Sequence, residues 1–301
     1  MLDCLIIGGG PAGMTAAIYL TRFHLDILVI DAGDSRTKLI PETHNHAGFP
    51  NGISGAELLA RMQQQAEKYG ATVKQNKISK ISRNESVFAA DWGEGKVVSH
   101  TVLLATGVVN RRPDIEEALH MEAIAMGRLR YCPVCDGYEV TDRNVAVIGT
   151  GERGTNEALF LRSFTRNVVL IGPDEKHKLD VAHRRLIDAA DIALIDGPAK
   201  ILRLDDDGVV IGTAKGEKTF YTVYPALGSD SNSMLAEMVG AQCDKAGSII
   251  VDTHQRTSVA GLYAAGDVVI GLDQISHAMG EAGVAATTIR NDLAKRHALL
   301  R

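Results

Sequence analysis

Two glycine-rich turns of the pattern G-x-G-x-x-G constrain the fold of this chain more than any other feature. The first, Gly8-Gly9-Gly10-Pro11-Ala12-Gly13, separates a strand-like run at 2–7 from a helix-forming stretch, and the second, Gly149-Thr150-Gly151-Glu152-Arg153-Gly154, follows the apolar run 145–148. In such a unit the first glycine permits the turn, the second lets the backbone approach a pyrophosphate, and the third lets the helix pack on the strand. The helix N-terminus then presents N–H groups and the positive end of its dipole to phosphates. We therefore expect two nucleotide-type units, which begin 141 residues apart (Gly8 to Gly149), too far for a solenoid repeat.

An acidic residue ends the second strand of the first unit. The apolar run 27–30 leads into Asp31, which lies 23 residues after Gly8. This order is typical of dinucleotide sites, where the carboxylate accepts hydrogen bonds from a ribose. A buried glycine turn without a ligand is the alternative, and it accounts less well for the acid. The first unit is therefore predicted to bind a dinucleotide.

Length and composition agree with two such units. A chain of 301 residues exceeds the usual domain size of about 100–200 residues. Apolar residues make up 45% of the chain, which is enough for hydrophobic cores and excludes a largely disordered protein. The predicted fold class is α/β, with two Rossmann-like (three-layer ββα) dinucleotide-binding domains.

Charge and hydropathy exclude other classes of protein. The net charge of −5 argues against a broad nucleic-acid-binding surface. No apolar run approaches the roughly 20 residues of a membrane span. The N-terminal residues 1–4 lack the basic start and cleavage site of a signal peptide, so we expect a cytoplasmic protein.

One C-x-x-C pair stands among only four cysteines. Cys132 and Cys135 enclose Pro133 and Val134. In a cytosolic protein such a pair more often indicates redox chemistry than cross-linking, because two intervening residues allow an intramolecular disulfide and rapid resolution of a mixed disulfide. The alternatives are a buried thiol pair or half of a zinc site. Zinc normally requires four ligands, and no second pair of suitable spacing exists, so no metal is predicted.

The motifs, taken in order, resemble those of the low-molecular-weight thioredoxin reductases, and the resemblance covers essentially the whole chain. Gly8–Gly13 is similar to the FAD turn of that family, and Asn45 with 46–50 to the stretch that passes the flavin ring. Ala105-Thr106-Gly107 is similar to the strand end where the chain passes between domains. Cys132-Pro133-Val134-Cys135-Asp136-Gly137 resembles the redox site, and Ala264-Ala265-Gly266-Asp267 followed by Gln274 the second FAD signature.

This resemblance implies a discontinuous FAD-binding domain, 1–112 and 245–301, with a nicotinamide-type domain that carries the C-x-x-C inserted as 113–244. It places the FAD pyrophosphate on the first glycine turn, the adenosine ribose on Asp31 and the ribityl–phosphate portion on Asp267. It also implies a homodimer. The residues expected to bind FAD are Gly8, Gly10, Pro11, Ala12, Gly13, Asp31, Asn45, Ala105, Thr106, Gly107, Gly266, Asp267, Gln274 and Ile275.

The resemblance also implies roles at the dithiol. Cys135 would exchange electrons with the flavin, Cys132 would attack the external disulfide, and Asp136 would be the acid–base group. The partner would be a thioredoxin-like protein or a small-molecule disulfide or dithiol. His277 lies at the expected start of the last helix, where it is either a proton-exchange partner of a thiol or a hydrogen-bonding residue beside the cofactor.

The second nucleotide site departs from the family. Where NADPH-dependent members have arginines for the 2′-phosphate, this chain has Gly172-Pro173-Asp174, which supplies no cation. Glu152 and Arg153 replace small residues in the turn, and Asp273 replaces the arginine that precedes Gln274. The candidate nicotinamide nucleotide residues are Gly149, Gly151, Gly154 and Asp174, and weak NADPH binding is predicted.

Three functions remain open. The favoured one is a flavin disulfide oxidoreductase with an atypical electron donor: NADH through Asp174, a reduced ferredoxin or flavodoxin-like protein, or another reductant. The second is a dithiol oxidase that passes electrons to oxygen. The third is a non-catalytic FAD redox sensor, which the intact Cys132, Cys135 and Asp136 disfavour.

Overall fold

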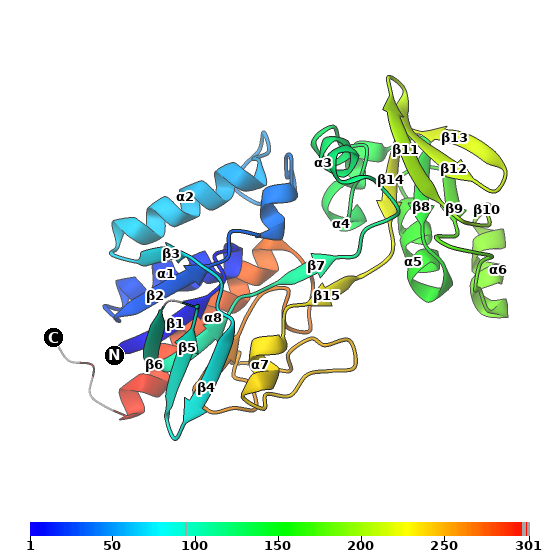
Figure 1. Cartoon of the computed structure of the whole chain (residues 1–301). Helices are drawn as coiled ribbons and strands as arrows, with labels where there is room; N and C mark the ends of the chain where they lie inside the picture. The colour runs from blue at the N-terminus through cyan, green and yellow to red at the C-terminus, as the bar shows by residue number, and fades with distance from the viewer. Residues whose placement is uncertain (94, 297–298, 300–301) are drawn as a thin grey trace.

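The computed structural model describes residues 1–93, 95–296 and 299, and these form two α/β units joined by a two-stranded ribbon (Figure 1). The ribbon consists of β7 (Val108–Asn110) and β15 (Ser229–Ser231), which pair antiparallel. The chain therefore leaves the first unit through β7 and returns to it through β15. Of the described helices, none is both long and apolar enough to cross a membrane.

A seven-stranded sheet forms the centre of the first unit. Six strands lie in the order β3-β2-β1-β6-β5-β4, and β16 also pairs with β6. The pairings β1–β2, β2–β3, β1–β6 and β6–β16 are parallel, whereas β5 pairs antiparallel with both β4 and β6. The strands are β1 (Leu2–Ile7), β2 (Ile27–Asp31), β3 (Thr72–Gln75), β4 (Lys80–Asn84), β5 (Val87–Asp91), β6 (Lys96–Leu104) and β16 (Leu262–Ala264).

Strand β6 pairs with strands from both segments of the chain that form the first unit. Its first half pairs with β5, with Ser99 opposite Phe88, and its last residues pair with β16, with Val102 opposite Leu262. Residues from before and after the second unit thus share one sheet, and the blue β1 and the red α8 of Figure 1 lie in the same unit.

Both faces of this sheet are buried, as expected for parallel strands. Alternate residues of β1 enter different cores: Cys4 and Ile6 face one cluster, and Leu5 and Ile7 the other. The first cluster includes many alanines from two packed helices, and these small side chains allow the helices to approach closely. The helices of this unit are α1 (Pro11–Arg22), α2 (Gly55–Lys68), α7 (Met234–Met238), α8 (Ile275–Arg296) and the 3-10 helix η1 (Arg36–Leu39).

The second unit contains a four-stranded parallel sheet in the order β10-β9-β8-β14 and a three-stranded antiparallel sheet in the order β11-β12-β13. Its strands are β8 (Val145–Ile148), β9 (Val168–Ile171), β10 (Ala193–Ile195), β11 (Lys200–Asp205), β12 (Gly208–Thr213), β13 (Gly216–Phe220) and β14 (Thr222–Pro225). Its helices are α3 (Glu117–Ala125), α4 (Pro133–Asp136), α5 (Gly151–Leu161), α6 (Val181–Ala189) and the 3-10 helix η2 (Tyr138–Val140).

The predicted fold class, α/β with two Rossmann-like units, is confirmed. Each glycine-rich turn lies between a parallel strand and a helix, β1 and α1 in the first unit and β8 and α5 in the second. The exact division into 1–112 with 245–301 and 113–244 stays a prediction, and its C-terminal limit at 301 lies outside the described residues.

Candidate functional site

A cavity of about 860 Å³ lies at the carboxyl ends of β1 and β2 and extends to the Cys132–Cys135 pair. This volume is typical of a site for a large ligand, and the carboxyl edge of a parallel sheet is where such folds bind nucleotides. Asp136 also lines it, next to the cysteines. The predicted FAD-binding residues that line it are Gly8, Gly10, Pro11, Ala12, Asp31, Asn45, Ala105, Thr106, Gly107, Gly266, Asp267, Gln274 and Ile275.

The first glycine turn is packed so closely that side chains are excluded. A Cβ added at Gly8, where φ is +108°, would lie 2.2 Å from the carbonyl oxygen of Ala105. A Cβ at Gly13 would lie 1.9 Å from the carbonyl oxygen of Gly8, which explains why Gly13 supports the turn without lining the cavity. The Gly9 N–H donates to Asp31 Oδ1 at 2.9 Å. The turn and the acid therefore form one unit, which fits the phosphate and ribose parts of a dinucleotide.

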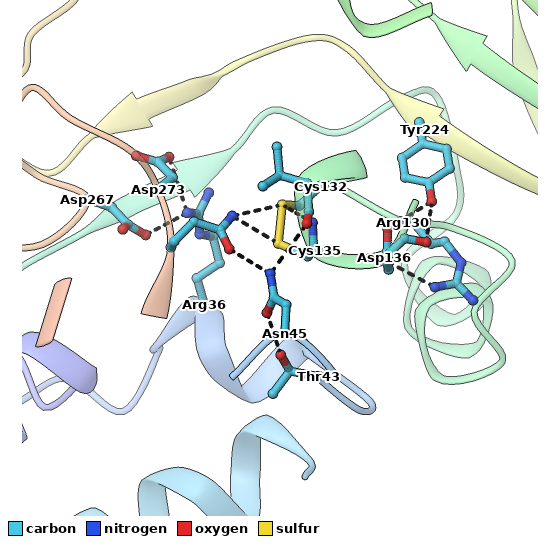
Figure 2. The surroundings of a disulfide bond; sticks show 12 residues. Arg36, Thr43, Asn45, Arg130, Cys132, Cys135, Asp136, Tyr224, Asp267 and Asp273 are labelled. Carbon is cyan, nitrogen blue, oxygen red and sulfur yellow. Dashed lines mark hydrogen bonds and ion pairs between the residues drawn. A yellow bond between two sulfur atoms is a disulfide. The ribbon is translucent and has the colours of Figure 1, made fainter. Parts of the chain in front are cut away.

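Arg36 is a cavity residue that the sequence did not suggest. Its Nη2 lies 2.5 Å from Asp267 Oδ2 and 3.2 Å from Asp273 Oδ2 (Figure 2). Its Nη1 donates to Asn110 Oδ1 at 3.0 Å. Burial, and then the neighbouring Asp267, raise the pKa of Asp273, whereas Arg36 opposes that shift. Arg36 thus places a cation beside the carboxylates of Asp267 and Asp273.

Cys132 and Cys135 form a disulfide with their Cα atoms 5.3 Å apart. Cys132 precedes the short helix α4, and the backbone N–H of Cys135 donates to Cys132 Sγ at 3.1 Å. Of the residues that the structure describes, no three His, Cys, Asp or Glu side chains gather in a way that could hold a metal ion. The pair therefore has the geometry of a redox disulfide at the end of the cavity.

Three polar side chains connect the disulfide to the first unit. Gln274 Nε2 lies 3.2 Å from each of the two sulfur atoms. Asn45 Nδ2 donates to Gln274 Oε1 at 3.0 Å. Thr43 Oγ1 donates to Asn45 Oδ1 at 3.0 Å (Figure 2). Asn45 and Gln274 were predicted as cofactor contacts, and the structure also brings both to the dithiol.

Asp136 is held by a cation and a phenol. Its Oδ2 lies 3.0 Å from Arg130 Nη1, and its Oδ1 accepts from the Tyr224 hydroxyl at 2.8 Å (Figure 2). Burial raises the pKa of Asp136, while Arg130 and Tyr224 lower it. Burial also raises the pKa of the nearby Glu157 to about 7. Within the described part of the chain, no hydrogen bond joins Asp136 to a sulfur atom.

The structure does not bring His277 to the disulfide. Its Nε2 lies 3.0 Å from Glu281 Oε1, its side chain is 44% exposed, and it is not part of the cavity wall. Glu281 Oε2 in turn accepts from the Gly266 N–H at 2.8 Å. Of the two interpretations of His277, the structure therefore favours a hydrogen-bonding residue behind the cofactor loop.

The second glycine turn repeats the close packing of the first, because a Cβ added at Gly149 would lie 3.1 Å from Gly154 Cα. The segment after β9 covers this turn: the Lys178 N–H donates to Thr150 Oγ1 at 2.8 Å, and the Lys178 carbonyl oxygen is the nearest atom to a Cβ at Gly151, at 3.7 Å.

Two further residues crowd the second site. The Arg153 guanidinium lies against Gly228, 3.1 Å from the place of a Cβ there, and Asp174 lies beside Gly197. Gly149, Gly151, Gly154 and Asp174 all lie outside the main cavity. The structure thus separates the candidate nicotinamide residues from the disulfide.

Known proteins share both the sequence and the fold. Residues 2–282 match the family model of pyridine nucleotide-disulphide oxidoreductases. A thioredoxin reductase from Treponema pallidum is 31% identical over 278 residues, which cover 88% of each chain. One from Helicobacter pylori is 29% identical over 96% of this chain and 98% of its own. The crystal structure of thioredoxin reductase from Streptococcus pyogenes has a TM-score of 0.89 at 26% identity and covers 98% of this chain and 99% of its own.

Proposed function

The chain belongs to the pyridine nucleotide-disulphide oxidoreductase family and is a thioredoxin reductase-like flavin disulfide oxidoreductase that binds FAD, and on this premise we propose that it reduces the disulfide of a thioredoxin-like protein. One observation carries the proposal: the Cys132–Cys135 disulfide lines the same cavity as the first glycine turn. A carrier of two electrons held on that turn would lie in the same cavity as the disulfide.

The residues proposed to hold FAD follow from the wall of the cavity. The turn at Gly8–Gly13 and the N-terminus of α1 would take the pyrophosphate, and Asp31 the adenosine ribose. Asp267 and Arg36 would contact the ribityl–phosphate portion. Ala105, Thr106 and Gly107 would contact the flavin end, near Asn45 and Ile275. When bound, FAD supplies a two-electron exchange with the disulfide.

In the proposed dithiol–disulfide exchange, the Cys132 thiolate attacks one sulfur of the partner disulfide. A mixed disulfide forms, and one partner thiolate leaves. Cys135 then attacks Cys132 Sγ, which re-forms the Cys132–Cys135 bond and releases the second partner thiolate. Asp136, with its pKa raised by burial, is the proposed source and acceptor of the proton that the leaving and attacking thiols exchange.

The proposal extends to the organisation of the protein. We assign FAD binding to 1–112 and 245–301, because β16 completes the sheet of β1 and β6, and we assign the dithiol to the inserted unit 113–244. A homodimer is proposed from the family alone. A cytoplasmic location is proposed because a single reactive dithiol among four cysteines suits a reducing compartment.

The electron donor is proposed to be atypical. The backbone of Lys178 covers the second glycine turn at Thr150, and Asp174 stands where a cation would receive a 2′-phosphate. A reduced redox protein, or NADH, would meet less repulsion than NADPH. The same observation favours a second candidate function, a dithiol oxidase that passes electrons to oxygen, because such an enzyme needs no nicotinamide nucleotide.

Anaerobic photoreduction of the FAD-loaded protein separates these functions. After illumination, oxidised thioredoxin is added in one sample, and oxygen with a dithiol in the other. A thioredoxin reductase re-oxidises with thioredoxin and produces two new thiols per flavin. An oxidase instead consumes oxygen in the sample with the dithiol, faster than it is re-oxidised by thioredoxin in the other sample. Cys132→Ser is the matched control that should stop the thiol-producing reaction, and an equal rate in this variant would contradict the proposal.

A further inference from the structure

The Gln274 side chain contacts the disulfide from the opposite unit with a defined orientation. The Thr43 hydroxyl donates to Asn45 Oδ1, which leaves the Asn45 amide group to donate to Gln274 Oε1. The Gln274 Nε2 group must then face the sulfur atoms, 3.2 Å from each. Because an amide oxygen only accepts and an amide nitrogen only donates, the three residues form a one-directional chain of donors that ends on sulfur.

The strength of the last contact depends on the redox state of the cysteines. A disulfide sulfur is a weak acceptor, whereas a thiolate carries a full negative charge and accepts charge-assisted hydrogen bonds that are about twice as strong as neutral ones. The Gln274 contact therefore stabilises the reduced pair more than the disulfide. Cys132 Sγ also accepts from the Cys135 N–H at 3.1 Å, so Cys132 has two donors where Cys135 has one.

We infer that the Thr43–Asn45–Gln274 chain is a positioning relay that stabilises the Cys132 thiolate of the reduced dithiol. An external dithiol supplies the two electrons: it becomes a disulfide, the Cys132–Cys135 bond breaks, and the pair becomes one thiolate at Cys132 and one thiol at Cys135, with one proton released to solvent. The inference rests on the proposed function, since a stable Cys132 thiolate is the nucleophile of that reaction. Gln274 would then stabilise the Cys132 thiolate in addition to lining the FAD cavity.

Gln274→Met tests this relay, because methionine keeps the length of the side chain and removes the donor. The FAD-loaded protein is equilibrated anaerobically with mixtures of reduced and oxidised dithiothreitol. It is then quenched with iodoacetamide, and mass spectrometry measures alkylation at Cys132 and Cys135 separately. We expect the equilibrium to move about tenfold toward the disulfide, which is about 30 mV for a two-electron couple. The pH at which Cys132 is half-alkylated in the reduced protein should rise by about one unit.

Two further variants separate the relay from a general disturbance. Asn45→Leu keeps the approximate size of residue 45 without adding a charge and removes its donor to Gln274 Oε1, and it should move both quantities in the same direction by a smaller amount. Gln63→Met, on the exposed face of α2, is the matched control and should change neither.

Folding and loading of every variant are checked by circular dichroism and the flavin-to-protein ratio. Folded Gln274→Met with an unchanged equilibrium and an unchanged Cys132 profile would overturn the relay. A failure of thioredoxin reduction in the parent protein would overturn the proposed function instead, because the alkylation assay does not depend on turnover.

Discussion

Arg36 and Asp267 form an ion pair of 2.5 Å across the cavity wall, although 231 residues separate them in the chain. The pair joins the segment after β2 to the turn after β16. Asp273 shares the same guanidinium at 3.2 Å. The end of the cavity proposed for the ribityl–phosphate portion of FAD thus contains two carboxylates and one cation, and that cation offsets their repulsion toward a phosphate.

Replacement of this cation should weaken FAD binding. In Arg36→Leu, Asp267 and Asp273 face the phosphates without compensation, and a charge-assisted contact contributes about 1.5–3 kcal/mol. We expect the FAD dissociation constant to rise by about tenfold to a hundredfold. Quenching of flavin fluorescence during titration of the apoprotein measures it. Arg184→Leu, which removes an exposed pair with Asp188 on α6, is the control; equal affinities in the two variants would exclude a role for Arg36.

The two cysteines should differ in their spectra. If Cys135 faces the flavin, Cys132→Ser leaves a thiolate there that forms a charge-transfer band with FAD, whereas Cys135→Ser does not. The measurement is the long-wavelength absorbance of each variant between pH 6 and 9. Identical spectra would contradict the assignment of the two sulfurs.

Tyr224 should affect the pH dependence of disulfide exchange, because its hydroxyl changes the pKa of Asp136. The Tyr224 hydroxyl donates to Asp136 at 2.8 Å and so favours the charged carboxylate. Tyr224→Phe removes this bond and should raise the pKa of Asp136 further. The limb of the kcat/KM profile that reports Asp136 should therefore move to higher pH, and Asp136→Asn should remove that limb and slow turnover by about a hundredfold or more. An unchanged profile in Tyr224→Phe would contradict this coupling.

Local sequence patterns were sufficient to predict the fold and the disulfide. The glycine spacing, Asp31 and the apolar strands predicted the fold, because each signal lies within about 30 residues of its partners along the chain. The C-x-x-C pair likewise predicted a disulfide, because the cysteines are three residues apart. These features depend on local backbone geometry, which residues close together in the sequence determine.

The remaining site residues depend on distant contacts. Arg36 meets Asp267 across 231 residues, Asn45 meets Gln274 across 229, and Tyr224 meets Asp136 across 88. No local pattern marks Arg36 or Tyr224, since an arginine or tyrosine elsewhere in the chain has the same sequence surroundings. The motifs that predicted Asn45, Asp136, Asp267 and Gln274 did not predict these pairings. His277 was left between two interpretations, a proton-exchange partner of a thiol and a hydrogen-bonding residue beside the cofactor, because its place at the start of a helix fits both. Its pairing with Glu281, one helical turn later, favours the second.

An ion cluster on α8 should make stability depend on pH. Asp292 accepts from Arg256 at 2.7 and 3.0 Å and from the Tyr263 hydroxyl at 3.0 Å. The hydrogen bond from Arg256 lowers the pKa of Asp292, so its contribution is fully present above the ordinary pKa of about 4 and is lost progressively as the pH falls from there through the lowered pKa of the folded state. Asp292→Asn should cost about 1–2 kcal/mol at pH 7, because the cluster is partly exposed.

Thermal denaturation of the parent protein and of Asp292→Asn at pH 7 and pH 3 measures this effect. The difference in Tm should be present at pH 7 and should shrink at pH 3. Asp188→Asn, which breaks an exposed pair within α6, is expected to change Tm little at either pH. A constant difference at both pH values would show that Asp292 contributes through packing rather than charge.

NADPH should reduce the flavin of this protein poorly. The 2′-phosphate carries close to two negative charges and normally requires an arginine or lysine within hydrogen-bond reach. Gly172-Pro173-Asp174 offers no cation and adds a carboxylate, and the Lys178 backbone covers the turn at Thr150. Replacing attraction by repulsion at this spot costs about 1–4 kcal/mol at surface screening, a loss of about tenfold to several hundredfold in affinity. NADH, which lacks that phosphate, should lose less.

The measurement is the anaerobic rate of flavin bleaching at several fixed concentrations of NADPH and of NADH, with photoreduction as the reference for full bleaching. Asp174→Arg tests the physical cause, because a guanidinium at that position pairs with the 2′-phosphate in two parallel hydrogen bonds. It should improve the apparent affinity for NADPH by about tenfold or more and leave that for NADH nearly unchanged. Fast bleaching of the parent protein by micromolar NADPH would show that another basic group binds the 2′-phosphate and that Lys178 leaves the turn when the nucleotide arrives.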